Sequence, residues 1–168
     1  MLIAHINCFT RFTLNLNDLY IISTMHSFPH NYKVSAQASS EGDVVLSADS
    51  LPNITSQPPV EFDGPGDRWS PESLLMAAIA DCFTLSFRAI AAASKVSFTD
   101  LNVDVDGELS MVERKMLFTN VQIKANLVVP ADVDTGRAER LLTMAEQACL
   151  VTNSLNVDCH LEASVTQA

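Results

Sequence analysis

Two of the four cysteines, Cys82 and Cys149, lie in segments where a reactive thiol could be positioned. Only a thiolate is nucleophilic, and a free cysteine in an apolar helix is more often an inert core residue. Both cysteines lie near small residues, Ala80 and Ala148 among them, in segments with helical spacing. Small residues let helices approach closely, and a disulfide needs its Cα atoms within about 7 Å. The residues alone leave Cys82 open to two interpretations, a redox-active thiol or a buried core residue.

For the other two cysteines, the sequence gives less reason to expect a chemical function. Cys159 and His160 are adjacent in an alternating segment, which places their side chains on opposite faces of a strand and makes Cys159 a buried strand residue. Cys8 lies near the N-terminus, ahead of the recognisable strands and helices, and we interpret it as incidental. No CxxC pair occurs, and no histidine flanks a cysteine at zinc-finger spacing, so we expect no metal.

The composition predicts one globular domain that does not depend on disulfides. The chain has 168 residues, of which 48% are apolar and 18% charged, and this suffices for an ordinary core. A formal net charge of -10 argues against a nucleic-acid partner, because phosphate binding needs clustered Lys and Arg. Continuous apolar runs are far shorter than a membrane span, so no membrane partner is expected. We expect a cytoplasmic location with reduced thiols.

The N-terminal half is expected to place a long loop ahead of a helix. Residues 32–36 alternate, and residues 43–47 follow a turn at Gly42, so two short strands are predicted. Residues 50–69 are rich in proline and glycine and are expected to form an irregular loop. A loop of that length inside a single domain is uncommon unless it is functional.

A long helix is predicted to begin after Ser70 and to continue to about Ser94. Ser70 has the hydroxyl of an N-cap, Pro71 suits the first helical position, and Glu72 places a carboxylate in the first turn. Apolar residues cover most of the circumference of this helix instead of one stripe. Such a helix is normally surrounded by protein on most sides.

The C-terminal half predicts a hairpin, a helix and a last strand. Two alternating segments within residues 98–129 are joined by a charged turn and form the hairpin. Asp132 or Asp134 caps a second helix that ends near Asn153, and residues 157–165 form the last strand. The predicted fold class is therefore α+β, with two long helices packed against an antiparallel sheet in one domain.

Two cysteine-containing segments resemble those of a known family. The stretches Phe62–Pro65 and Ser70–Phe83 look like the loop and the first-cysteine helix of OsmC/Ohr proteins. Residues 149–155 resemble the second-cysteine segment, in which a cysteine, two residues, a hydroxyl residue and a downstream leucine recur. With the order of elements, the resemblance covers an OsmC-like domain over residues 28–168. Residues 1–27 lie outside it, and both an N-terminal extension and an ordered strand pair are open there.

The resemblance implies an intertwined homodimer that reduces organic hydroperoxides and hydrogen peroxide without a cofactor, as an antioxidant enzyme. In that family the first cysteine attacks the peroxide and becomes a sulfenic acid, and the second condenses with it to a disulfide. By this correspondence Cys82 is the peroxidatic cysteine and Cys149 the resolving one. An external thiol or dithiol then reduces the disulfide. A resolving thiol also protects the sulfenic acid from irreversible over-oxidation.

The groups expected to activate Cys82 match the family only in part. Glu72 corresponds to a glutamate at the start of the family's helix, but the arginine of the N-terminal hairpin has no counterpart here. We expect Arg68 to take its place, whereas the alternative is an exposed loop arginine paired with Asp67. Ten residues separate Glu72 from Cys82, about 15 Å along one helix. Assistance must therefore come from a second subunit or from a loop that folds back.

Trp69 and Phe83 are the candidates for a substrate pocket. Trp69 lies in the loop, whereas plain core packing is the alternative for Phe83. Two other functions remain open at this point. One is a non-catalytic dimer of the same fold that binds a small apolar or acyl ligand, favoured by the missing arginine. The other is a stress-associated structural protein with incidental thiols.

Overall fold

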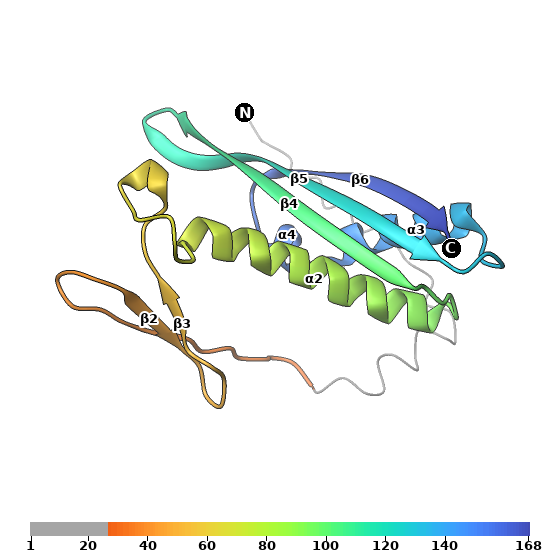
Figure 1. The fold of residues 1–168 in the computed structure, drawn as a ribbon, viewed down its shortest axis with the longest axis horizontal. Helices are drawn as coiled ribbons and strands as arrows, with labels where there is room; N and C mark the ends of the chain where they lie inside the picture. The colour runs from red at the N-terminus through yellow and green to blue at the C-terminus, as the bar shows by residue number, and fades with distance from the viewer. Residues whose placement is uncertain (1–26) are drawn as a thin grey trace, which may run out of the picture. The chain divides into compact units, whose positions relative to one another are not determined.

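Two three-stranded sheets and two long helices make up the fold of residues 33–168 (Figure 1). The computed structural model describes residues 27–168. The elements are β1 Ser35–Gln37, β2 Val44–Ser47, β3 Ile54–Ser56, a 3-10 turn at Val60–Phe62, α2 Pro71–Ala93, β4 Asp100–Val112, β5 Lys115–Val129, α3 Thr135–Ala148, α4 Leu150–Asn153 and β6 Asp158–Gln167. The predicted α+β class is confirmed. The alternatives for the N-terminal segment, and Cys8, fall outside the described residues.

The first sheet is antiparallel in the order β1-β2-β3. The two predicted strands form β1 and β2, joined across Gly42, whose φ of 89° suits a residue without a Cβ. The segment predicted to be irregular contains a third strand, β3, in which Ile54 pairs with Leu46. The pattern missed β3 because only three residues between prolines form it, and its order comes from pairing with β2.

The second sheet has the order β4-β5-β6 and mixed directions. The predicted hairpin is present, and its turn places Glu113 and Arg114 at φ 49° and 67°, as a tight hairpin turn requires. β6 pairs parallel to β5, with Asp158 beside Asn120, so the prediction of a purely antiparallel sheet was wrong in this detail. The reason is the connection: α3 carries the chain back across the sheet, and such a crossover joins parallel strands.

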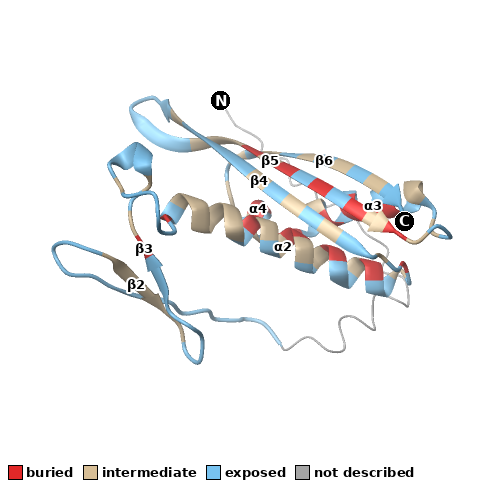
Figure 2. Ribbon diagram, in the orientation of Figure 1, coloured by how far each residue is buried: buried red, intermediate tan, exposed pale blue. Residues whose placement is uncertain are grey.

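The core lies between this second sheet and the helices α2 and α3, which contact its strands on one face. α2 contributes residues spaced by four, and β5 contributes alternate residues, as their periods of 3.6 and 2 require (Figure 2). These buried side chains are Ile79, Phe83, Phe87 and Ala91 from α2 and Val121, Ile123, Ala125, Leu127 and Val129 from β5. The opposite face of the sheet presents alternating polar side chains to solvent.

α2 begins and ends as predicted, at a capping box on Ser70 and at Ser94. The Ser73 amide donates to Ser70 Oγ over 3.2 Å, and the Ser70 amide donates to Ser73 Oγ over 2.8 Å. An 18-residue window of α2 has a mean hydropathy of 1.7, so by length and composition alone the helix could span a membrane. Only 22% of this window is buried inside the chain. Leu85, for example, is 51% exposed. The chain by itself therefore covers one stripe of this helix and not most of its circumference.

α3 begins where predicted but ends earlier. The Arg137 amide donates to Asp134 Oδ1 over 2.6 Å, which makes Asp134 the N-cap. The helix was expected to continue to Asn153, yet it stops at Ala148, because Cys149 has an extended backbone with ψ 111°. The short helix α4 follows immediately. Cys149 therefore lies at a break between two helices and not on the surface of one.

Candidate active site

The fold brings Cys82 and Cys149 together. Cys82 lies in the middle of α2 and is half-buried, whereas Cys149 is 0% exposed. Both are free thiols, and Cys149 lies near enough to Cys82 to raise the pKa of the Cys82 thiol. α2 contacts both α3 and α4, so the break at Cys149 is held against the helix that carries Cys82. Two neighbouring thiols on elements that contact each other are candidates for oxidation to a disulfide.

The groups around Cys82 shift the pKa of its thiol in opposite directions. Burial raises the pKa of the Cys82 thiol above its ordinary value, backbone hydrogen bonds from Val151 and Leu150 oppose this, and the hydrogen bond and charge of Cys149 raise the pKa further. The two amides are free for this role because the first N–H groups of a helix have no partner within it. In one chain the net effect favours the neutral thiol.

These amide donors were missed by sequence reasoning. A backbone N–H belongs to almost every residue, so no residue type signals it. Thr152 supports the same turn, since its hydroxyl donates to the Cys149 carbonyl oxygen over 3.2 Å and the residue is buried. The turn that follows Cys149 is therefore part of the environment of the thiol pair.

Glu72 has a buried oxygen without a partner. Among residues 27–168, its Oε2 accepts no hydrogen bond although it is shielded from solvent. An unsatisfied buried acceptor is unfavourable by about 1–3 kcal/mol, more when charged. Glu72 borders an apolar pocket of about 320 Å³ between β2 and the start of α2, lined by Val44, Ser56, Gln57, Pro58, Pro59, Phe62 and Pro71. A donor for this carboxyl group is missing from the described chain.

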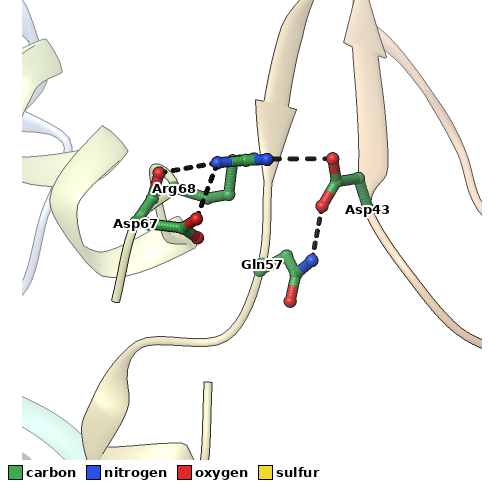
Figure 3. Close-up of polar contacts among 4 residues, drawn as sticks. All are labelled: Asp43, Gln57, Asp67 and Arg68. Carbon is green, nitrogen blue, oxygen red and sulfur yellow. Dashed lines mark hydrogen bonds and ion pairs between the residues drawn. The ribbon is translucent and has the colours of Figure 1, made fainter. Parts of the chain in front are cut away.

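Arg68 is engaged elsewhere within the chain (Figure 3). Its Nη1 lies 3.0 Å from Asp67 Oδ2, and its Nε lies 3.5 Å from Asp43 Oδ2. Gln57 also donates to Asp43, and this bond, followed by the Arg68 charge, lowers the pKa of the Asp43 carboxyl below its ordinary value despite some burial. The contact with Asp67 is the one that the alternative for Arg68 expected. That Arg68 acts on the Cys82 thiol stays a prediction, and it would require a second copy of the chain.

The two candidates for a substrate pocket have different surroundings. Trp69 is 52% exposed and borders an open pocket of about 840 Å³ together with Asp43, Arg68 and Ser73. Its carbonyl oxygen accepts from the Gln57 amide over 2.9 Å, which joins the loop to β3. Phe83 is 0% exposed and belongs to the core cluster. Its packing matches the core alternative and not a pocket wall, because the stripe of α2 that carries it faces the sheet.

No group of three or more His, Cys, Asp or Glu side chains that could hold a metal ion occurs in the part of the chain that the structure describes. The groups that the described chain brings to this site are thiols, a carboxyl group and backbone amides. Thiol pairs of this kind can form a sulfenic acid and a disulfide without any other resident group.

Several solved structures share this fold. An OsmC-like protein of unknown function from Vibrio cholerae has a TM-score of 0.74 at 17% identity, covering 81% of this chain and 100% of that one. An organic hydroperoxide resistance protein OsmC from Legionella pneumophila has a TM-score of 0.68 at 27% identity, covering 83% and 100%. The organic hydroperoxide resistance protein OhrB of Bacillus subtilis has a TM-score of 0.62 at 22% identity, covering 80% and 98%.

Sequence comparison agrees with the structural one. The uncharacterized protein YmaD of Bacillus subtilis is 28% identical over 112 residues, which are 64% of this chain and 75% of that protein. The family model described as OsmC-like protein matches residues 64–163, more than half of the 168-residue chain and inclusive of both site cysteines. The predicted resemblance is confirmed, and the chain belongs to the OsmC-like protein family.

Proposed function

We propose that this protein is a thiol-dependent peroxidase that reduces organic hydroperoxides and hydrogen peroxide through Cys82 and Cys149. The observation that carries the proposal is that the half-buried Cys82 on α2 neighbours the fully buried Cys149, which lies at the break between α3 and α4, two helices that contact α2. Family membership supports it, as do the names of the Legionella and Bacillus proteins, which describe resistance to organic hydroperoxides. Free thiols suit the reducing cytoplasm, where we place the protein.

The proposed reaction has three steps. The Cys82 thiolate attacks one peroxide oxygen, the O–O bond breaks, and the alkoxide leaves as an alcohol after taking a proton, which gives a Cys82 sulfenic acid. Cys149 then attacks the Cys82 sulfur and displaces the hydroxyl as water, which forms the Cys82–Cys149 disulfide. An external dithiol reduces this disulfide to two thiols and is itself oxidised. No other cofactor is required.

We propose further that the working form is a homodimer. α2 leaves much of its apolar surface uncovered within one chain, and a second copy offers the same surface in return. The unpartnered oxygen of Glu72 needs a donor, and the Cys82 thiolate needs a positive neighbour. Arg68 of a second copy would place a positive charge beside the Cys82 thiolate if it left its ion pair with Asp43. The dimer therefore provides the route by which Arg68 and Glu72 act on Cys82.

The test is the loss of thiols on mixing the reduced protein with cumene hydroperoxide or hydrogen peroxide. The wild type should lose two thiols faster than free cysteine does, and should then contain a Cys82–Cys149 disulfide by peptide mapping. Cys82→Ser should lose neither at that rate, and Cys8→Ser serves as the matched control. Oxidation of the wild type no faster than free cysteine would end the peroxidase proposal.

A second candidate is a non-catalytic dimer that binds a small apolar or acyl ligand. The apolar pocket beside Glu72 favours it, because three prolines and Phe62 form much of its wall. The raised pKa of the Cys82 thiol, caused first by burial, also favours it, since a neutral thiol is a poor nucleophile. Peroxide-independent binding of a fluorescent fatty acid, with no thiol oxidation, would select this function over the first.

A further inference from the structure

Glu72 borders two pockets that adjoin one another. Besides the apolar pocket between β2 and the start of α2, it lines a second pocket of about 430 Å³ between the 3-10 turn and the β4–β5 hairpin (Figure 1). The other residues of this second pocket are Pro59, Glu61, Phe62, Gly107, Glu108, Leu109 and Phe118. Pro59, Phe62 and Glu72 line both pockets, so the two meet at the Glu72 side chain.

The 3-10 turn between the two pockets is fixed by its own backbone. The amides of Phe62 and Gly64 both donate to the Pro59 carbonyl oxygen, over 2.9 and 3.0 Å. A Cβ atom at Gly64 would lie 1.6 Å from the Pro58 carbonyl oxygen, so only glycine fits against the two prolines. The wall that the pockets share is therefore formed by the chain itself, as is usual for a ligand site.

Gly107 brings soft apolar groups to the second pocket. Met76 lies one turn after Glu72 on α2, and its sulfur is 2.6 Å from the place that a Cβ atom of Gly107 would occupy. The Phe118 ring lies 3.1 Å from the same place. The missing side chain thus lets a thioether and an aromatic ring pack closely beside this pocket. Such groups accommodate an apolar chain, and an aromatic face also attracts an ammonium ion.

The charged side chains of both pockets are carboxylates. Glu72 is half-buried, whereas Glu61 and Glu108 are exposed in the second pocket. Of the described residues that line either pocket, none is Lys, Arg or His. Glu108 Oε1 accepts from the Ser110 hydroxyl over 3.0 Å, but Glu72 Oε2 is shielded from solvent and has no donor within residues 27–168. These pockets therefore suit a ligand that brings a donor and a positive charge.

The same groups disfavour three other ligands. In the described chain no three His, Cys, Asp or Glu side chains are close enough together to hold a metal ion. A fatty acid would place a second carboxylate beside Glu72, where like charges repel and no donor is gained. An alcohol would supply a donor without a charge. A primary ammonium group supplies both, because it has three N–H donors and no acceptor.

We propose that Glu72 anchors a primary ammonium group carried on an apolar chain. The ammonium group donates a hydrogen bond to Glu72 Oε2, which satisfies the buried acceptor, and Glu61 and Glu108 add negative charge around it. The apolar chain lies along Pro59 and Phe62 toward the pocket between β2 and α2. This inference names a ligand class for the pocket of the second candidate function, and it does not involve the thiols.

Four ligands with the same eight-carbon chain test the proposal. n-Octylammonium, n-octyltrimethylammonium, n-octanol and n-octanoate are titrated into the reduced full-length protein at pH 7 by calorimetry. We expect n-octylammonium to bind at least about tenfold more tightly than n-octanol, as a hydrogen bond to a charged group requires. The trimethylammonium ligand should bind more weakly than the primary one because it has no N–H, and n-octanoate should bind most weakly.

Glu72→Gln locates the binding, because it keeps the size of the side chain and removes its charge. The affinity for n-octylammonium should fall by about tenfold, to near that for n-octanol. Glu139→Gln, on α3 and outside both pockets, is the matched control and should bind as the wild type does. Circular dichroism of both variants shows whether the fold is kept.

Several outcomes would overturn the proposal. They are an equal affinity of the wild type for n-octylammonium and n-octanol, no binding of either, or a preference for n-octylammonium that survives in Glu72→Gln. Tighter binding of n-octanoate would overturn it as well and would support an acyl ligand. Because no peroxide is present and no thiol reacts, each of these results leaves the peroxidase proposal standing.

Discussion

The middle of α2 and its beginning are organised differently. Around Cys82 the chain itself supplies a buried partner thiol and two amide donors. Around Glu72 and Arg68 it supplies an exposed loop, an unpartnered carboxyl oxygen and an arginine that pairs with nearby aspartates. The difference is that the chain itself brings a second thiol and two amide donors to Cys82, whereas burial still raises the pKa of the Cys82 thiol.

Replacement of the buried thiol should have the largest effect. In Cys149→Ser, the Cys82 sulfenic acid has no neighbouring thiol to condense with, so we expect one equivalent of peroxide to leave Cys82 as a sulfenic acid that dimedone traps, and to form no intramolecular disulfide. Excess peroxide should then convert Cys82 to the sulfinic acid, detected by mass spectrometry as a gain of two oxygen atoms. Cys8→Ser is the control. An intramolecular disulfide of Cys82 in Cys149→Ser would mean that Cys149 is not the resolving cysteine.

Core and loop aromatics should differ sharply in their effect on stability. Phe83→Ala removes a fully buried ring from the stripe of α2 that faces the sheet, and should lower the free energy of unfolding by about 3–5 kcal/mol. Trp69→Ala should lower it by roughly 1 kcal/mol, because half of its side chain is exposed. Urea denaturation of both variants measures this. Similar losses would show that the loop is packed as tightly as the core.

The N-cap of α2 should contribute less to the free energy of unfolding than the buried ring of Phe83 does. Ser70→Ala removes the hydroxyl that accepts from the Ser73 amide, and we expect a loss of about 1 kcal/mol in the free energy of unfolding. Ser70→Asp keeps an acceptor at the same position and should restore most of it. Both values come from urea denaturation. A Ser70→Asp protein as unstable as Ser70→Ala would contradict the capping role.

The smallest effect on stability, and the most informative one for activation, is expected from Arg68→Ala. Its ion pairs are partly exposed, so the free energy of unfolding should fall by less than about 1 kcal/mol. If Arg68 of a second copy approaches Cys82, its removal takes away a positive charge that lowers the thiol pKa. The pH dependence of iodoacetamide alkylation at Cys82 should then shift to higher pH, with slower reaction at pH 7.

Asp43→Asn is the matched control for this prediction. It removes one of the carboxylates that hold Arg68 within its own chain, so Arg68 should be freer to serve Cys82. The alkylation profile should therefore shift to lower pH, opposite to that of Arg68→Ala. Unchanged profiles in both variants would assign Arg68 to the surface of the loop. The beginning of α2 would then have no part in activating its middle.

Features decided by neighbouring residues could be predicted from the sequence. Ser70 and Pro71 define the start of α2 because capping depends on a hydroxyl and a fixed φ at adjacent positions. The hairpin of β4 and β5 follows from alternation on both sides of a short turn. Cys82 and Cys149 were identified by residue type and by resemblance, and the structure places them in contact. Their roles in catalysis stay predictions.

Features decided by contacts between distant residues could not. β3 is ordered by pairing with β2, and β6 is parallel because α3 crosses the sheet. The break at Cys149 is an extended backbone in a segment whose residues alone predicted a continuing helix. It is this break that turns the amides of Leu150 and Val151 toward Cys82.

The sequence by itself determined the thiols and the helix that carries the first of them, because residue types and local spacing specify both. Only the tertiary structure decided which groups surround those thiols. Backbone amides have no residue signature, and the unpartnered oxygen of Glu72 is visible only once every neighbour is in place.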